Sequence, residues 1–148
     1  MIRFVHVFCA ILLAFSASPL VAGDSPQEQR HDLMEKSKDA AKPVGGMLKG
    51  EVEFDAATAM ASFKTWAEVA EQFGDLFPEG TETGYDTEAR MEIWTDRAGF
   101  DAELKKFSDA ANAAVAANPQ SLDELKAAAG PVFKTCKGCH EGYRVEKE

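Results

Sequence analysis

Residues 121–143 read SLDELKAAAGPVFKTCKGCHEGY, and this stretch predicts an amphipathic helix near the end of the chain. Ser121 and Glu124 have the spacing of a capping box, in which each side chain binds the backbone N–H of the other residue. The apolar face behind them is expected to hold Leu122, Leu125, Ala129, Val132, Cys136, His140 and Tyr143. A cysteine and a histidine therefore share the face that should pack against the rest of the molecule.

Three further helical stretches precede this one. The first opens with a capping box at Ser25 and carries an apolar stripe through Leu33 and Val44, with a kink expected at Pro43. The second begins after Asp55 and is expected to stop at Phe77-Pro78. Its apolar face should hold Met60, Phe63, Ala67, Ala70 and Phe73. The third follows residue 96, with Phe100, Leu104, Phe107, Ala111 and Ala114 as its apolar stripe.

The predicted fold class is all-α, an antiparallel four-helix bundle. No stretch alternates apolar and polar residues as a half-buried strand would, and four helices of this length suit such a bundle. Residues 78–94 show no clear periodicity. A connection of that length is unusual inside a compact domain, and such loops often cover a functional site or cross the fold.

The first 23 residues predict a signal peptide, which leaves residues 24–148 as the bundle domain. Arg3 supplies a positive start, an apolar run follows from Val5, and Val21-Ala22-Gly23 offers small residues for cleavage. A retained membrane anchor is the alternative, but the apolar run is shorter than the ~20 residues that a spanning helix needs. We therefore expect export, most simply to a bacterial periplasm, and no membrane insertion after cleavage.

The composition narrows the class of partner. The chain has 148 residues, with 16 Lys+Arg against 25 Asp+Glu and a formal net charge of −9. An acidic chain without a basic stripe is a poor candidate for binding nucleic acid. Cys9 lies in the predicted signal peptide, so the mature chain keeps two cysteines, which cannot form a disulfide scaffold.

Both of those cysteines belong to the pentapeptide Cys136-Lys137-Gly138-Cys139-His140. Two thiols at this spacing can each add to a vinyl group of one haem, and the adjacent imidazole can then bind the iron. Expected export agrees with this interpretation, since such attachment occurs outside the cytoplasm. The motif predicts one covalently bound haem c.

Three other interpretations of the motif are weaker. A thioredoxin-like C-x-x-C should open a helix after a strand, but this one lies near the end of a helix. A zinc site would need two more ligands, and only His31 and scattered carboxylates remain. A disulfide between residues three apart would stabilise little, because the loop that it closes is very short.

A sixth ligand to the iron would have to come from upstream of the motif. The candidates are Met34, Met47, Met60, Met91 and His31. A methionine on an apolar helical face more often packs in the core than binds a metal. A haem iron with one free face makes a ligand role more plausible, and a bis-histidine haem with His31 is the less favoured alternative.

The chain resembles the class II c-type cytochromes, which comprise cytochrome c′ and its low-spin relatives. Four features carry the resemblance: CKGCH followed by EGYR near the C-terminus, Arg30 to Met34 in the first helix, the turn from Lys49 to Asp55, and FPEGT followed by EIWTD. The likeness covers essentially the whole mature chain.

This resemblance implies a role for each site residue. Cys136 and Cys139 carry the haem, His140 is the proximal ligand, and Met34 falls at the family's distal position. Arg30 lies one helical turn from Met34 and is either a contact to a haem propionate or a solvated charge. Arg144 resembles an arginine near the proximal face in cytochrome c′, or is a surface charge.

The favoured function is that of a monohaem electron carrier, with a low-spin haem between His140 and Met34. No general acid, base or nucleophile is implied, so no enzymatic activity is expected. The partners would be periplasmic redox proteins, and the chain would be a monomer or a homodimer. In the alternative, Met34 only packs over a five-coordinate, high-spin haem that binds nitric oxide or carbon monoxide.

Overall fold

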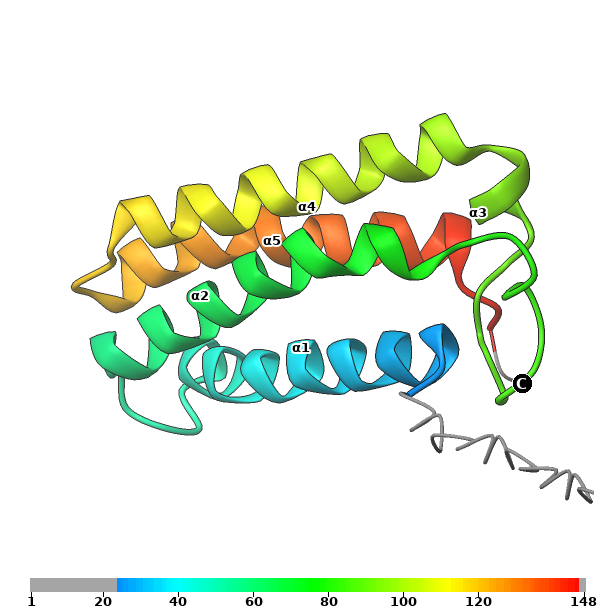
Figure 1. The fold of residues 1–148 in the computed structure, drawn as a ribbon. Helices are drawn as coiled ribbons and strands as arrows, with labels where there is room; N and C mark the ends of the chain where they lie inside the picture. Colours follow the sequence, from blue (N-terminus) through cyan, green and yellow to red (C-terminus); the bar gives the residue numbers. More distant parts are fainter. Residues whose placement is uncertain (1–23, 147–148) are drawn as a thin grey trace, which may run out of the picture.

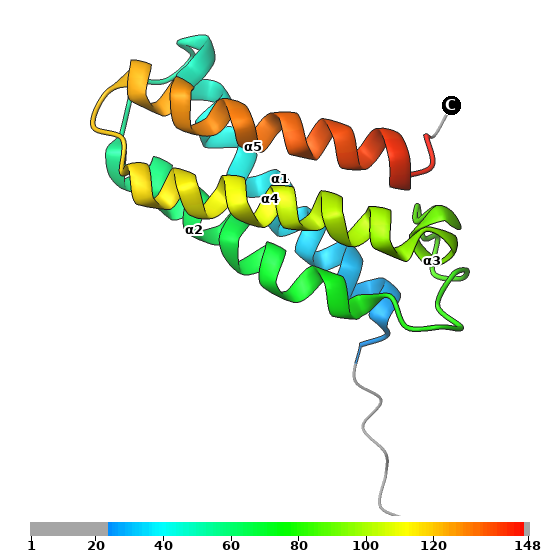
Figure 2. The same ribbon diagram turned by 90° about the horizontal axis from the view of Figure 1, so that it is seen from above.

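The computed structural model describes residues 24–146, so the predicted signal peptide lies outside the described residues. Four long helices form the bundle: α1 (Pro26–Lys49), α2 (Ala56–Phe73), α4 (Arg97–Ala117) and α5 (Leu122–Tyr143). They run antiparallel in sequence order (Figures 1 and 2). The expected all-α four-helix bundle is confirmed. Between residues 24 and 146, no helix combines the length and the apolar character needed to cross a membrane.

Side-chain caps fix where the long helices begin. At the start of α1, the Ser25 hydroxyl accepts from the Glu28 N–H at 3.2 Å and the Glu28 carboxylate accepts from the Ser25 N–H at 2.9 Å. The Asp55 carboxylate accepts from the Thr58 N–H at 2.7 Å and begins α2. Such caps satisfy backbone donors that have no partner inside the helix. The helix α1 is continuous through Pro43.

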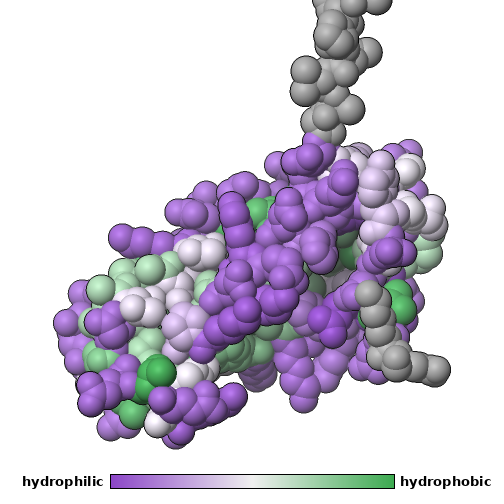
Figure 3. All heavy atoms as spheres, turned by 90° about the horizontal axis from the view of Figure 1, so that it is seen from below, coloured by the Kyte–Doolittle hydropathy of each residue, from purple (hydrophilic) through white to green (hydrophobic). Residues whose placement is uncertain are grey.

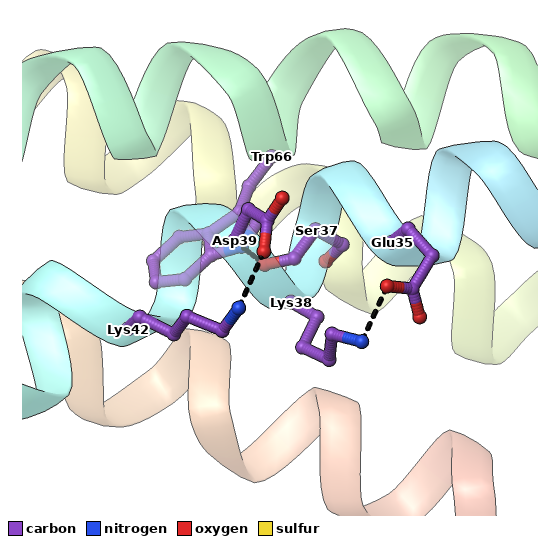
Figure 4. A network of polar contacts seen from close by, with 6 residues as sticks. All are labelled: Glu35, Ser37, Lys38, Asp39, Lys42 and Trp66. Atoms are coloured by element: carbon purple, nitrogen blue, oxygen red, sulfur yellow. Dashed lines mark hydrogen bonds and ion pairs between the residues drawn. The ribbon is translucent and has the colours of Figure 1, made fainter.

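The four helices pack in the order of the chain. The contacts are most extensive between α1 and α2, between α2 and α4, and between α4 and α5, while α1 and α5 touch much less. Trp66 lies at the centre, with its ring centroid 5.8 Å from Phe63 on its own helix and 5.5 Å from Phe133 on α5. Its indole N–H donates to the Ser37 carbonyl of α1 at 3.0 Å (Figure 4). One side chain thereby joins three helices.

The outer side of α1 is polar. Lys42 pairs with Asp39 at 2.7 Å, and Lys38 pairs with Glu35 (Figure 4). Figure 3 shows the underside of the bundle, where hydrophilic side chains dominate and paler or hydrophobic residues are visible mainly toward the two ends. Exposed pairs of this kind contribute little stability, so burial of the apolar faces holds the bundle together.

The structure corrects several details of the sequence prediction. The core face of α2 is rotated, because Ala59, Trp66 and Val69 are buried while Met60 and Ala67 are only half-buried. In α5, Leu122 is exposed by 43%, whereas Leu125 in the same first turn is fully buried. The helix α2 also ends at Phe73, before the expected stop, and a 3-10 turn η1 (Gly74–Leu76) follows.

Gly74 lies just past the end of α2, close to a side chain of α4. A Cβ atom at this position would lie 2.8 Å from Cδ2 of Leu104 on α4, closer than two carbon atoms can approach without movement. A side chain at this position would therefore require the end of the Leu104 side chain to shift. The chain then leaves the helix and turns across the end of the bundle.

The connection between α2 and α4 covers one end of the bundle. We call residues 77–91 the end segment. It leads into α3 (Glu92–Thr95), a short helix at the end of the stretch that shows no clear periodicity. The end segment lies at the end where α1 starts and α5 finishes (Figures 1 and 2). An antiparallel bridge pairs Ala89 with Arg144, just past the last turn of α5.

Candidate haem site

The two cysteines of the motif lie on α5 as free, half-buried thiols. Cys136 packs against the main core. Burial raises the pKa of Cys136 above its usual value. It also raises the pKa of Cys139 to about 11, with smaller contributions from the Glu103 carboxylate and from Cys136. In the chain before haem attachment, both thiols are therefore protonated at neutral pH, and no disulfide joins them.

His140 occupies the turn of α5 that follows the thiols, and it is half-buried. Burial lowers the pKa of its imidazole, and the nearby Arg144 guanidinium lowers it further. A terminal nitrogen of Arg144 lies 3.4 Å from Nδ1 of His140. The imidazole is therefore neutral at pH 7, which is the form that binds a metal. Arg144 also lies 3.8 Å from the Glu88 carboxylate of the end segment.

Met34 lies on α1, half-buried against the main core. The other upstream candidates are less suited to a shared site with α5. His31 is exposed, and Met91 is exposed by 53%. Met47 is buried, and its sulfur accepts the backbone N–H of Asp55 at 3.2 Å. Met60 lies near the start of α2, at the end of the bundle away from the end segment (Figure 1).

Arg30 is buried, with 5% of its surface exposed, so the interpretation as a solvated charge is wrong. Its guanidinium lies over two rings, 4.6 Å from the Phe77 centroid and 5.6 Å from the Trp94 ring. Such contacts stabilise a desolvated cation. The two terminal nitrogens donate to the Leu76 carbonyl at 3.3 Å and to the Thr81 carbonyl at 2.8 Å.

One N–H of Arg30 has no partner. Its Nε is the single buried side-chain nitrogen or oxygen within residues 24–146 that lacks a hydrogen bond. An unsatisfied buried donor costs free energy, and a guanidinium N–H is suited to an anionic acceptor. The propionate contact predicted for Arg30 stays a prediction, and this free donor is compatible with it.

The side chains present fit a covalently attached haem. Two free thiols and a neutral imidazole share α5, a thioether lies on α1, and these two helices contact each other less than any neighbouring pair of long helices. Thiols, imidazole and thioether are the donors that c-type haem uses. The fold and this donor set define a class of protein, a four-helix bundle with a haem held by two thioether bonds.

Comparison with known proteins agrees with this class. The family model described as Cytochrome C' matches residues 25–144. Cytochrome c' of Rhodopseudomonas palustris is 40% identical over 121 residues, which cover 80% of this chain and 81% of the relative. Cytochrome c-556 of the same organism is 32% identical over 148 residues, with 97% of each chain covered. The solved cytochrome c' structure from Rhodopseudomonas palustris superimposes with a TM-score of 0.81 at 36% identity, covering 85% of this chain and all of the other.

The chain therefore belongs to the cytochrome c′ family, and it carries one covalently bound haem c. This membership confirms the resemblance and the cofactor that the sequence predicts. The roles of individual residues toward the haem stay predictions.

Sequence reasoning missed the residues that surround Arg30 and the end of α5. Phe77, Thr81 and Trp94 lie in the segments FPEGT and EIWTD, which were recognised for their likeness but given no role. Glu88 and Arg90 carried no signal at all, since nothing in the sequence places residues 88–90 beside residue 144. The sequence carried no signal for the contacts of Arg30 either, because its aromatic partners come from distant segments.

Proposed function

We propose that this protein is a periplasmic carrier of single electrons, with a low-spin haem c ligated by His140 and Met34. When bound, the haem supplies an iron that alternates between the ferric and ferrous states. The observation that carries the proposal is the position of Met34, whose thioether is half-buried on α1. Among neighbouring long helices, α1 and α5 have the least extensive contact, and α5 carries the haem-binding motif. The relative named cytochrome c-556 spans the same length of chain.

The chain's own residues would hold the haem from two sides. Cys136 and Cys139 attach it to α5, and His140 supplies a neutral imidazole one residue further on. Arg30, with one unpartnered N–H, would donate to a propionate. We assign no general acid, base or nucleophile, and we propose that the protein is not an enzyme.

Export, partners and assembly are part of the same proposal. Residues 1–23 would direct the chain to the periplasm and be removed there. The partners would be protein electron donors and acceptors, and the protein would be a monomer or a homodimer.

A second candidate function is the binding of nitric oxide or carbon monoxide by a high-spin haem with Met34 unbound. Two observations favour keeping it. Several of the matched relatives bear the name cytochrome c', and a variant from Alcaligenes xylosoxidans has been solved as a nitric oxide complex. Met34 also packs against the main core, as a methionine that does not bind the iron would be expected to do.

The visible spectrum of the purified holoprotein separates the two functions. The electron carrier should show sharp low-spin bands, a methionine-to-iron charge-transfer band when oxidised, and no response to carbon monoxide. Replacing Met34 with alanine should then give a high-spin spectrum. Met60→Ala serves as a matched control, because Met60 is also half-buried but lies near the start of α2. A wild-type spectrum that is already high-spin and responds to carbon monoxide would favour the gas-binding function. A low-spin spectrum that Met34→Ala leaves unchanged would mean that another residue, such as His31, is the sixth ligand.

A further inference from the structure

The end segment contacts both helices that carry the proposed iron ligands. On its first half, the Thr81 carbonyl accepts from Arg30 at 2.8 Å and the Thr83 carbonyl accepts from Gln27 at 3.0 Å, and both donors lie on α1. Its last residues pair with the end of α5. The N–H of Arg90 donates to the Tyr143 carbonyl at 3.0 Å, and the N–H of Val145 donates to the Glu88 carbonyl at 2.8 Å.

The last turn of α5 needs such support. Gly138 and Gly142 lie on either side of His140, and glycine inside a helix costs about 1 kcal/mol relative to alanine. The last carbonyls of any helix also have no partner within the helix. A turn built this way would fray, and His140 would move with it.

Arg90 supplies the missing donors. Its backbone N–H binds the Tyr143 carbonyl, and its guanidinium donates to the Glu141 carbonyl at 3.4 Å. A second guanidinium nitrogen is held by the Glu92 carboxylate at 2.8 Å, which fixes the side chain in place. Glu88, two residues earlier, lies near Arg144 on the same turn. Two positively charged side chains are thereby held at the negative end of the α5 dipole, where cations are favourable.

We propose that the end segment is a brace that holds α1 and α5 at a fixed spacing, with Arg90 as the positioning residue for His140. Residues 81–83 fix the brace to α1 and residues 88–90 fix it to α5, which matters because α1 and α5 contact each other little directly. The brace holds the two ligand-bearing helices in register. Arg90 itself forms no hydrogen bond to His140 or Met34 and acts on the last turn of α5. The role of Arg90 toward His140 rests on the proposed function, in which His140 is an axial ligand.

Amide hydrogen exchange of the holoprotein tests the α5 end of the brace. In Arg90→Gln, the amides of residues 140–144 should exchange about tenfold faster, as loss of a charge-assisted hydrogen bond to a helix end predicts. Amides in α2 should keep their rates. Arg90→Lys should recover part of the protection, and Lys105→Gln, which removes an exposed cation on α4, should change neither region. Unchanged exchange at residues 140–144, or equal acceleration in all helices, would overturn the role of Arg90.

Lengthening the brace tests whether it joins the two helices. The tip of the end segment consists of Gly84, Tyr85 and Asp86, all with positive φ, and none of them contacts α1 or α5 through a hydrogen bond in the described residues. Two glycines inserted after Tyr85 leave both anchors intact. The haem absorption bands should then change at a lower temperature than the far-ultraviolet circular dichroism, whereas the two probes coincide in the wild type.

Coincident transitions in the insertion variant would overturn the brace and leave two independent anchors. These readouts also separate the inference from the proposed function. Hydrogen exchange reports the turn whether or not His140 binds iron, and a failed His140–Met34 ligation would appear in the wild-type spectrum alone.

Discussion

Replacing Trp66 with phenylalanine should cost about 2–3 kcal/mol of unfolding free energy. The indole is 1% exposed and donates to the Ser37 carbonyl at 3.0 Å, so the variant loses one hydrogen bond between α1 and α2. A hydrogen bond of this kind contributes about 1 kcal/mol. The smaller ring also leaves a gap beside Phe63 and Phe133, and a buried gap of a few atoms costs about 1–2 kcal/mol more.

Urea unfolding of the holoprotein, followed by circular dichroism and by haem absorption, measures this loss. In a separate thermal unfolding experiment, the melting temperature of a domain of this size should fall by about 8–12 °C. Trp94→Phe is the matched control, since Trp94 is half-buried and donates to the Pro78 carbonyl at 3.2 Å in an exposed setting. We expect Trp94→Phe to cost less than about 1 kcal/mol. If the two variants lose the same free energy, Trp66 does not join the helices as described.

Two further predictions concern stability. Gly99→Ala should destabilise the protein by about 1–3 kcal/mol, because a Cβ there would lie 2.6 Å from the Tyr143 hydroxyl. Gly45→Ala, where nothing lies within 4 Å, should instead stabilise it by about 0.5–1 kcal/mol; thermal unfolding that shows no difference between these variants would contradict the packing. The hydrogen bond from Thr58 lowers the pKa of Asp55 below its usual 3.8. The ionised Asp55 carboxylate therefore stabilises the fold fully above pH 3.8, and this stabilisation is lost as the pH falls through the lowered pKa. Acidification should thus lower the unfolding free energy of the wild type more steeply than that of Asp55→Asn.

The sequence predicts the helices well where local chemistry decides them. Ser25, Asp55 and Ser121 each cap a helix as expected, because a cap depends on residues only three positions apart. Only half of the capping box predicted at Ser121 forms, since the Glu124 carboxylate accepts from the Gln120 N–H at 2.7 Å instead. The face of α2 is less predictable. Periodicity alone fits two neighbouring stripes, and the choice between Trp66 and Ala67 as the buried member depends on the space that α1 and α5 leave.

The site divides in the same way. The motif at residues 136–140 predicts haem attachment by itself, because attachment through two thioether bonds depends only on the local spacing of the two cysteines and the histidine. Arg30 could be named from its place one turn before Met34, but not its burial, since Phe77 and Trp94 come from distant segments. The support that Arg90 gives to α5 is a contact across 51 residues of chain and leaves no periodic signal.

The weak contact between α1 and α5 has a thermodynamic consequence. These are the first and last long helices, so a bond from Met34 to an iron carried on α5 would close the longest loop in the bundle and restrict the unfolded chain most. By linkage, tighter binding of Met34 in one oxidation state would add to the stability of the folded protein in that state. The difference in unfolding free energy between the ferric and ferrous forms would thus equal the difference in reduction free energy between the folded and the unfolded protein. Denaturation curves measure the first quantity and an electrode measures the second.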